Sequence, residues 1–372
     1  MNNKLKKVVK KAKPSVGRVP AAIKGRLSSV GRRRKNREEA TAEALQTLPR
    51  ITNDTVAEHR EQVLSSARKY IYPLQHSKNR IIKISTSLFV VAVVVFFAYC
   101  GVALYKLHST STFVYEVSRV IPFPVAKAGP RWVAYENYLF ELRHLTHYYE
   151  VQQKEDLDGK DKPHLDALRK DSLQKVIDDA YVKQLAEKNN ISISNREVND
   201  QIALVKAQNR LGSTDQMLSD VLKQFWGWSI SDFRRELKTQ LLSQKVASEL
   251  DTATQARANN TLAELQAGKD FGTLASQMSD DTVTKVNGGQ YGAPISKNNR
   301  DVSPQVVDAL FKLQPGQTSA VINTGYTLEI VKNIAVTDDK VQAAHISFQI
   351  KAISNYIDPL EKDKPPKRFI SL

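Results

Sequence analysis

The sequence predicts an α+β protein: a single transmembrane helix, then a mostly helical domain, then an antiparallel sheet with surrounding helices. Three observations predict this. A long basic segment leads into an uncharged apolar run, and the middle of the chain repeats apolar residues at helical spacing. In the last third, turns at 288–289 and 314–316 precede a segment, 341–350, in which apolar residues alternate. The expected divisions are 1–82, 83–106, 113–250, 251–352 and 353–372.

The net charge of +16 belongs to the first segment of the 372-residue chain. Residues 1–83 hold 21 Lys and Arg against 6 Asp and Glu, whereas the remaining 289 residues hold 34 against 33. A segment so poor in aromatic residues cannot bury a core, so we expect residues 1–82 to be a largely disordered basic tail in the cytoplasm, with a short amphipathic helix near 54–70. The tail could contact anionic lipid or nucleic acid, or it could only fix orientation. We favour the last, and nucleic acid is disfavoured because no interleaved aromatic residues accompany the charges.

Twenty-two uncharged residues lie between Lys83 and Lys106, in the run ISTSLFVVAVVVFFAYCGVALY. A helix that crosses the hydrocarbon core of a membrane needs about 20 such residues. Cations crowd the N-terminal side of this run, so the positive-inside rule predicts a single-pass protein of the cell membrane with residues 107–372 outside the cytoplasm. The only cysteine, Cys100, lies within the span, which excludes a disulfide framework and a cysteine-based zinc site.

Residues 113–250 have the pattern of a helical domain. Two short apolar runs, 112–123 and 124–135, could be extended, and a helix over 136–149 and a polar loop over 151–164 are expected to follow. Four helices come next: one with an apolar face over 173–185, and three that we expect to begin at Ser194, Ser213 and Ser229, each followed three residues later by Glu, Gln or Asp.

The segments LQKVIDDAYVKQLAEKNNISISNREVNDQI and SISDFRRELKTQLLSQKV resemble the N-terminal chaperone domain of SurA-type foldases. The resemblance covers about residues 120–250 and implies a cradle for unfolded polypeptide. Trp226 and Trp228 could line it, although a tryptophan pair near a helix break is more often part of a core. Residues Glu141, His144, His147 and Glu150 recur at helical three-residue steps, but one polar helix face explains them better than a metal site, so we expect no metal and no cofactor.

Residues 255–336 resemble a parvulin-type peptidyl-prolyl isomerase domain, the module that accompanies such chaperone domains in the SurA and PrsA families. The matching landmarks, in the family's order, are Gly268–Phe271, Leu274–Ala275, Ser279–Asp281, Gly288–Gly289, Ala309–Leu313, Pro315–Gly316 and Gly325–Tyr326. The resemblance implies isomerisation of prolyl bonds in exported polypeptides.

The expected first parvulin strand is missing before residue 255, and a sequence of that type, VQAAHISFQI, follows the domain at 341–350. We predict a hairpin of strands 326–336 and 341–350, which would make the sheet a circularly permuted one; the alternative is the start of a second, truncated repeat. Alternation places Ala344, Ile346, Phe348 and Ile350 inward, and His345 on the opposite, cleft-facing side.

The resemblance implies a catalytic cluster of His345, Asp281 and Thr327 and a proline pocket of Tyr291, Val302 and Val306. Thr327 stands where the family has a second histidine, Val306 replaces an aromatic residue, and Tyr291 replaces a Leu or Met-like residue. These departures leave two functions open, a catalytic foldase or a non-catalytic holdase with a degenerate parvulin domain. A membrane tether that binds nucleic acid or ribosomes through the basic tail is a third hypothesis. Residues 353–372, rich in proline and charge, are expected to form a flexible tail.

Overall fold

The structure, a computed structural model, describes residues 52–71, 74–208 and 210–372, and the chain divides into two compact units after Val91. Most of the predicted basic tail, residues 1–51, lies outside the described residues. Of the rest of that tail, 53–71 form helix α2 (Asn53–Ile71) and 74–82 belong to α3 (Leu74–Tyr105). The predicted helix near 54–70 is therefore confirmed, and disorder is wrong for these residues.

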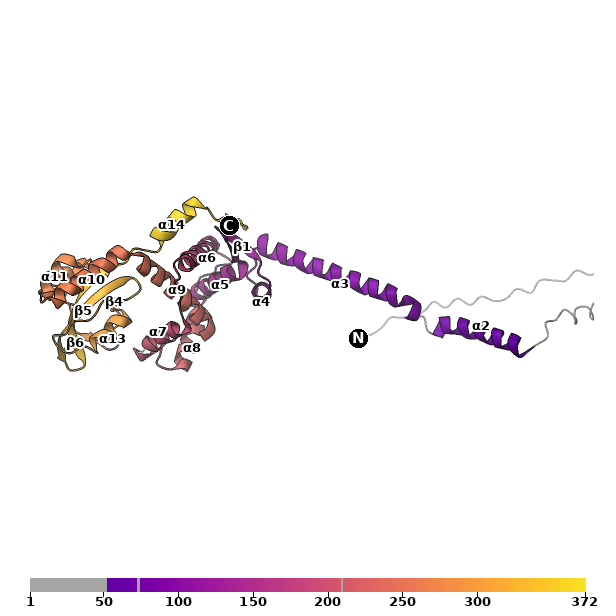
Figure 1. Cartoon of the computed structure of the whole chain (residues 1–372), viewed down its shortest axis with the longest axis horizontal. Helices are drawn as coiled ribbons and strands as arrows, with labels where there is room; N and C mark the ends of the chain where they lie inside the picture. Colours follow the sequence, from indigo (N-terminus) through magenta and orange to yellow (C-terminus); the bar gives the residue numbers. More distant parts are fainter. Residues whose placement is uncertain (1–51, 72–73, 209) are drawn as a thin grey trace, which may run out of the picture. The chain divides into compact units, whose positions relative to one another are not determined.

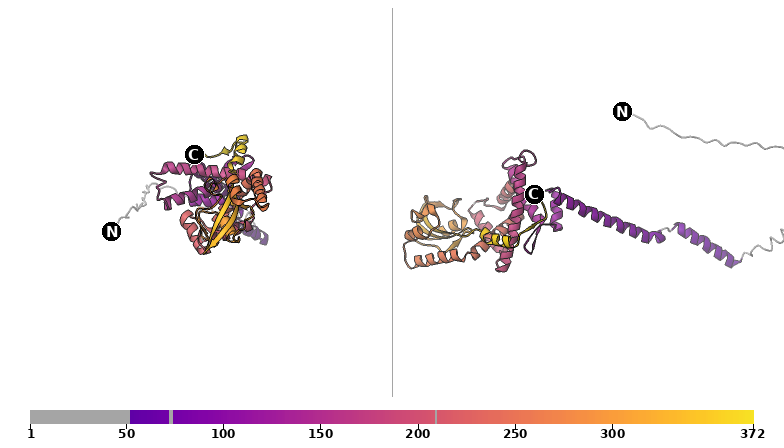
Figure 2. Two further views of the ribbon diagram at one scale, coloured as in Figure 1. Left: turned by 90° about the vertical axis from the view of Figure 1, so that its left-hand side faces the viewer. Right: turned by 90° about the horizontal axis from the view of Figure 1, so that it is seen from above.

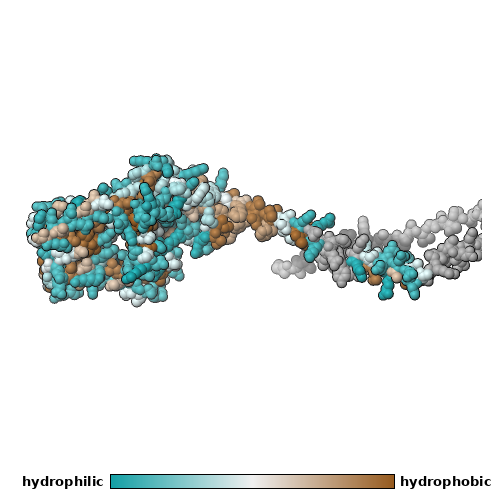
Figure 3. Space-filling model, in the orientation of Figure 1, coloured by the Kyte–Doolittle hydropathy of each residue, from teal (hydrophilic) through white to brown (hydrophobic). Residues whose placement is uncertain are grey.

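One helix among the described residues is long and apolar enough to cross a membrane, over Arg80–Tyr105 of α3, and its apolar side chains are the brown stretch in Figure 3. The last turns of α3 belong to the folded second unit. Ala103 and Leu104 are buried in its core, and Tyr135 donates its hydroxyl to the Leu104 carbonyl at 2.6 Å. The end of the predicted span thus packs against protein.

The helical domain follows α3, as Figure 1 shows. Its elements are α4 (Thr112–Val120), β1 (Pro124–Ala128), β2 (Arg131–Ala134), α5 (Tyr135–Val151), α6 (Lys162–Lys188), α7 (Asn195–Ala207), α8 (Asp215–Trp226) and α9 (Ile230–Leu250). The apolar run 124–135 is extended, as expected, and forms the β1–β2 hairpin. The run 112–123 is mostly helix α4, because Ser111 caps its N-terminus and Val114 and Ser118 turn one buried face inward.

The predicted helix starts depend on side-chain caps. Capping boxes are present at Ser194 with Glu197 and at Ser229 with Asp232. The third start is one residue later than predicted, since the hydroxyl of Thr214 accepts the amide of Met217. These caps pair amide groups that would otherwise lack partners in the first helical turn.

The second domain begins where Asp251 both ends α9 and caps the next helix. Its elements are α10 (Thr252–Gln266), α11 (Phe271–Met278), α12 (Thr282–Lys285), β3 (Ile295–Ser296), α13 (Pro304–Leu310), β4 (Ile322–Asn323), β5 (Thr327–Thr337) and β6 (Lys340–Gln349). The strands form one antiparallel sheet in the order β3-β6-β5-β4. The predicted hairpin of the last two long strands is therefore confirmed.

Each face of this sheet has its own apolar core. Leu328, Ile330, Ala344, Ile346 and Phe348 pack with α10 and α11. Val331, Val341 and Ala343 face the other way and pack with α13. The alternation predicted for β6 is thus confirmed, and it places His345 on the α13 side.

The C-terminal segment is not a flexible tail, and that prediction is wrong. It forms α14 (Ser354–Asp363), which contacts α6, and β7 (Lys367–Arg368), which pairs with β1. Ile357 and Ile370 are buried in the core of the helical domain. Figures 1 and 2 show the yellow end of the chain lying against the helical domain. The helical domain is therefore formed by two segments of the chain, one that precedes the sheet domain and one that follows it.

Candidate active site

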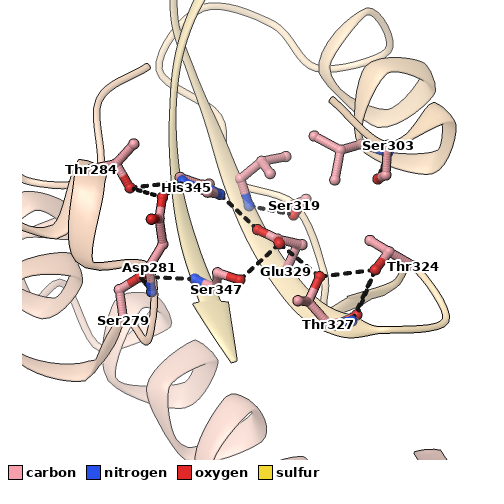
Figure 4. Close-up of polar contacts among 12 residues, drawn as sticks. Ser279, Asp281, Thr284, Ser303, Ser319, Thr324, Thr327, Glu329, His345 and Ser347 are labelled. Carbon is pink, nitrogen blue, oxygen red and sulfur yellow. Dashed lines mark hydrogen bonds and ion pairs between the residues drawn. The ribbon is translucent and has the colours of Figure 1, made fainter. Parts of the chain in front are cut away.

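His345 lies in the middle of the sheet, opposite Val331 in the register of β5 and β6. Glu329 is the next residue of β5 on the same face, since side chains alternate along a strand. Figure 4 shows His345 held between two carboxylates that come from different elements. Its Nδ1 is 2.8 Å from Glu329 Oε2, and its Nε2 is 3.0 Å from Asp281 Oδ2 and 2.8 Å from Thr284 Oγ1.

Asp281 reaches His345 because backbone bonds hold the 279–281 segment against β6. The amide of Asp280 donates to the Ser347 carbonyl at 2.7 Å, and the amide of Ser347 donates to Ser279 Oγ at 3.1 Å. Asp281 then caps α12, where it accepts the Val283 amide and the Thr284 hydroxyl. The acid is thereby fixed in one orientation.

Tyr291 lies on the His345 ring, with the two ring centroids 4.4 Å apart. The Gly288–Gly289 turn makes this approach possible. Gly289 has a φ of +78°, and a Cβ on it would lie 2.2 Å from the His345 carbonyl oxygen, so no other residue fits there. The Gly289 carbonyl accepts the His345 amide at 2.8 Å, and the Tyr291 amide donates to the Ala343 carbonyl at 3.0 Å.

Both nitrogens of His345 face a carboxylate, which favours the doubly protonated imidazolium. Burial opposes this charge, but the hydrogen bond and charge of Glu329, followed by those of Asp281, outweigh it and raise the pKa of His345 above 6.5. Burial would raise the pKa of Asp281, but hydrogen bonds from Thr284, Val283 and His345 outweigh that effect and lower it.

These shifts predict how stability depends on pH. The stability from His345 is fully present below its unfolded pKa and is lost as pH rises through the raised folded value; that from Asp281 is present above its unfolded pKa and is lost as pH falls through the lowered folded value. In an NMR titration of the imidazole, Glu329→Gln should bring the His345 pKa down toward 6.5. Asp308→Asn, at a carboxylate on α13 paired with Lys312, is the control. An unchanged His345 pKa in Glu329→Gln would contradict the ion pair.

The structure brings together His345 and Asp281 but not His345 and Thr327. The hydroxyl of Thr327 donates instead to Glu329 Oε1 at 2.8 Å, and the Ser347 hydroxyl donates to the same oxygen at 2.9 Å. Thr327 therefore joins the cluster through Glu329 and does not contact His345 directly. Glu329 is the residue that sequence reasoning missed. A single carboxylate in the apolar run TLEIVKNIAV was the available signal.

The three predicted pocket residues lie in or against one apolar cluster on the α13 side of the sheet. Tyr291 and Val302 are half-buried, so each has a surface that a ligand can touch. Val306 is 1% exposed and packs with Val307, Leu310 and Val331. Its predicted role as a wall of the pocket is therefore corrected to that of a buried support.

A hollow of about 400 Å³ lies in the helical domain between α5 and the turn after α8. Trp228 stacks on Phe140 at 6.0 Å and on Trp226 at 5.8 Å, and its indole Nε1 is buried with no hydrogen-bond partner. The tryptophans that were expected to be either core or cradle are thus half-buried and line a cavity.

The histidines of α5 belong to the wall of this hollow. His144 is buried, with its Nε2 3.7 Å from Glu141, and His147 contacts the Gln224 carbonyl at 3.2 Å. Among the residues that the structure describes, no group of three or more His, Cys, Asp or Glu side chains is placed to hold a metal ion. Each of these two histidines has a protein partner.

Comparisons with known proteins bear on both domains. The family model of a SurA-like N-terminal domain matches residues 74–247, and that of a PPIC-type PPIase domain matches residues 240–335. The chain thus matches a SurA-like N-terminal domain followed by a PPIC-type PPIase domain. The second match ends before β6, so the strand that carries His345 lies outside the matched segment.

Three curated relatives agree with these matches. Foldase protein PrsA of Caldanaerobacter subterraneus is 26% identical, over 57% of this chain and 74% of that protein. Foldase protein PrsA of Lacticaseibacillus paracasei is 30% identical, over 38% of this chain and 54% of that protein. Chaperone SurA of Albidiferax ferrireducens is 28% identical, over 41% of this chain and 37% of that protein. The chain thus spans about three quarters of the first relative and about half or less of the other two.

Proposed function

We propose that the chain is a membrane-anchored foldase that isomerises prolyl bonds in exported polypeptides and holds those polypeptides while they fold. The single observation that carries the proposal is the network of Asp281, His345 and Glu329 beside the half-buried Tyr291 and Val302. It places a fixed polar group beside partly exposed apolar side chains.

Prolyl isomerisation breaks no covalent bond, and its barrier of about 18–20 kcal/mol comes from amide resonance. An enzyme must therefore bind the twisted amide better than the planar isomers. In the planar amide, resonance places negative charge on the carbonyl oxygen. The lowered pKa of Asp281 keeps its carboxylate negative, so a carbonyl near Asp281 is destabilised while it is planar and relieved as it twists.

The residues take different roles in this proposal. The Asp281 side chain is 28% exposed and that of His345 is 9% exposed, so Asp281, with Thr284 beside it, is the group that touches the amide. His345 and Glu329 are positioning residues that hold this acid and keep it ionised. Tyr291 and Val302 bind the proline ring.

The helical domain supplies the chaperone part of the proposal. The half-buried Trp226 and Trp228, with the buried Phe140 stacked behind Trp228, offer flat apolar surface to a bound chain. The alternative function, a holdase without catalysis, is favoured by Thr327 in place of the family's second histidine. The basic flank of α3 supports an orientation with residues 107–372 outside the cytoplasm.

The test measures both activities on the full chain in detergent micelles. We expect acceleration of a prolyl peptide in an NMR exchange assay at micromolar protein, and suppression of aggregation of a reduced, unfolded client. Aggregation suppression without any acceleration would leave only the holdase. Protease added to intact spheroplasts should remove a C-terminal tag and spare an N-terminal one; the reverse would overturn the orientation.

Tyr291→Ala should raise the KM of the prolyl peptide by roughly tenfold to a hundredfold, because a ring that buries apolar surface against the proline is worth about 1.5–3 kcal/mol. Tyr326→Ala is the matched control, since that ring is 60% exposed. Aggregation suppression should be unchanged in both variants. Equal KM values in Tyr291→Ala and the wild type would remove Tyr291 from the pocket.

A further inference from the structure

The turn between α7 and α8 of the helical domain reaches the loop that carries Val302 in the sheet domain. Arg210 Nη2 donates to the carbonyl of Asn299 at 2.8 Å and also to that of Val302, and its Nη1 is 3.4 Å from the carbonyl of Arg300. Gln208 donates to the Pro304 carbonyl at 2.7 Å and accepts Arg210 Nε at 2.8 Å. One guanidinium thus gathers three carbonyls of a loop about ninety residues further along the chain.

The loop itself is short and tightly turned between β3 and α13. The side chain of Asn299 accepts the amides of Asp301 and Val302, both at 2.9 Å. This turn directs the carbonyls of residues 299, 300 and 302 toward the helical domain, while the Val302 side chain packs against the cluster of Tyr291 and Val306. The same few residues therefore face Arg210 on one side and the proposed proline pocket on the other.

We propose that Arg210 is a positioning residue through which the helical domain sets the place of Val302 in the proline pocket. The inference rests on the proposed isomerase function, because it concerns how the proline pocket of that function is held in shape. A guanidinium suits this role because it presents its donors in a rigid fork and keeps its charge, so it can hold several carbonyls at once.

Gln208 reinforces the contact between Arg210 and the loop. Its side chain is 5% exposed, and it joins the Arg210 side chain to the first residue of α13. The contact therefore includes both the 297–303 loop and the start of α13, the helix that packs behind the proposed pocket.

Hydrogen exchange on the full chain in micelles tests the contact directly. In Arg210→Ala we expect the amides of Asp301 and Val302 to exchange at least about tenfold faster, because loss of hydrogen bonds from a charged donor frees the loop. Arg210→Lys should protect them only in part, since an ammonium cannot reproduce the fork. Arg196→Ala, an exposed arginine of α7 that pairs with Asp200, is the control and should leave the exchange unchanged. Wild-type exchange in Arg210→Ala would overturn the inference.

Kinetics on the same variants separate positioning from general stability. We expect Arg210→Ala to raise the KM of a prolyl peptide several-fold with kcat within about twofold of the wild type, since the pocket wall moves while Asp281 does not. The KM of Arg210→Lys should lie between those of the wild type and Arg210→Ala. Faster amide exchange in Arg210→Ala with an unchanged KM would show that Arg210 holds the loop without setting the pocket, and would overturn the inference. If the wild-type chain showed no isomerase activity, the proposed function would fail, and exchange would still decide whether Arg210 holds the loop.

Discussion

Replacing His345 with leucine is expected to abolish isomerase activity and to lower the free energy of unfolding of the sheet domain by about 3–5 kcal/mol. The reason lies with its partner. The Glu329 side chain is 10% exposed, and without the imidazolium its carboxylate keeps only two hydroxyl donors, Thr327 and Ser347. A charge left buried without a counter-charge is costly, and Asp281 loses the group that holds it.

The double variant His345→Leu with Glu329→Leu separates these two effects. Removing both charges together should recover most of the lost stability, because no unpaired charge remains, whereas activity should stay absent. The three tryptophans all lie in the helical domain, so stability is best followed by hydrogen exchange of the β5 and β6 amides. A double variant as unstable as His345→Leu alone would show that burial of Glu329 without its partner is not the cause.

Deleting residues 353–372 is expected to destabilise the helical domain, although most of that domain precedes the sheet domain in the sequence. Ile357 and Ile370 fill its core, and the Tyr181 hydroxyl donates to the Lys364 carbonyl at 2.6 Å. Truncating one buried isoleucine to alanine costs about 2–5 kcal/mol, so losing the whole segment should unfold the domain or cause aggregation.

A milder variant measures the same effect in a folded protein. Ile357→Ala should lower the free energy of unfolding by about 2–5 kcal/mol, and Asp358→Ala, at the exposed neighbouring residue, should leave it nearly unchanged. Trp132 stacks on Phe369 at 5.7 Å, so its emission reports whether β7 is docked. A flexible tail predicts the opposite: no change in stability for either variant or for the deletion.

Much of the fold could be predicted from local patterns. Capping residues marked Ser194 and Ser229 as helix starts, and period-two alternation placed His345 on the face opposite Ile346. These features depend on residues a few positions apart, so the sequence displays them directly. The helix of 112–120 was missed because its run TFVYEVSRV is rich in the β-branched and aromatic residues that are also typical of strands. Its buried face packs on α5.

The candidate site was predicted only in part. Asp281 and His345 were named through resemblance, and the hairpin brings β6 to the place where they meet. Glu329 was missed, Thr327 was assigned too direct a role, and Val306 was taken for a wall. Each error concerns a distance between side chains on different strands or helices. Such distances follow from register and from helix packing, which no short pattern specifies.

The sequence by itself determined the apolar helix, the helical and sheet domains, the β5–β6 hairpin and the basic charge of the first segment, because each is written in neighbouring residues or in composition. Only the tertiary structure decided that the last twenty residues pack on the helical domain and that two carboxylates enclose His345. It also decided that Arg210 donates hydrogen bonds to the loop that carries Val302. These contacts join residues far apart in the chain. They exist because buried apolar surface and unpaired polar groups must find partners wherever the fold brings them within reach.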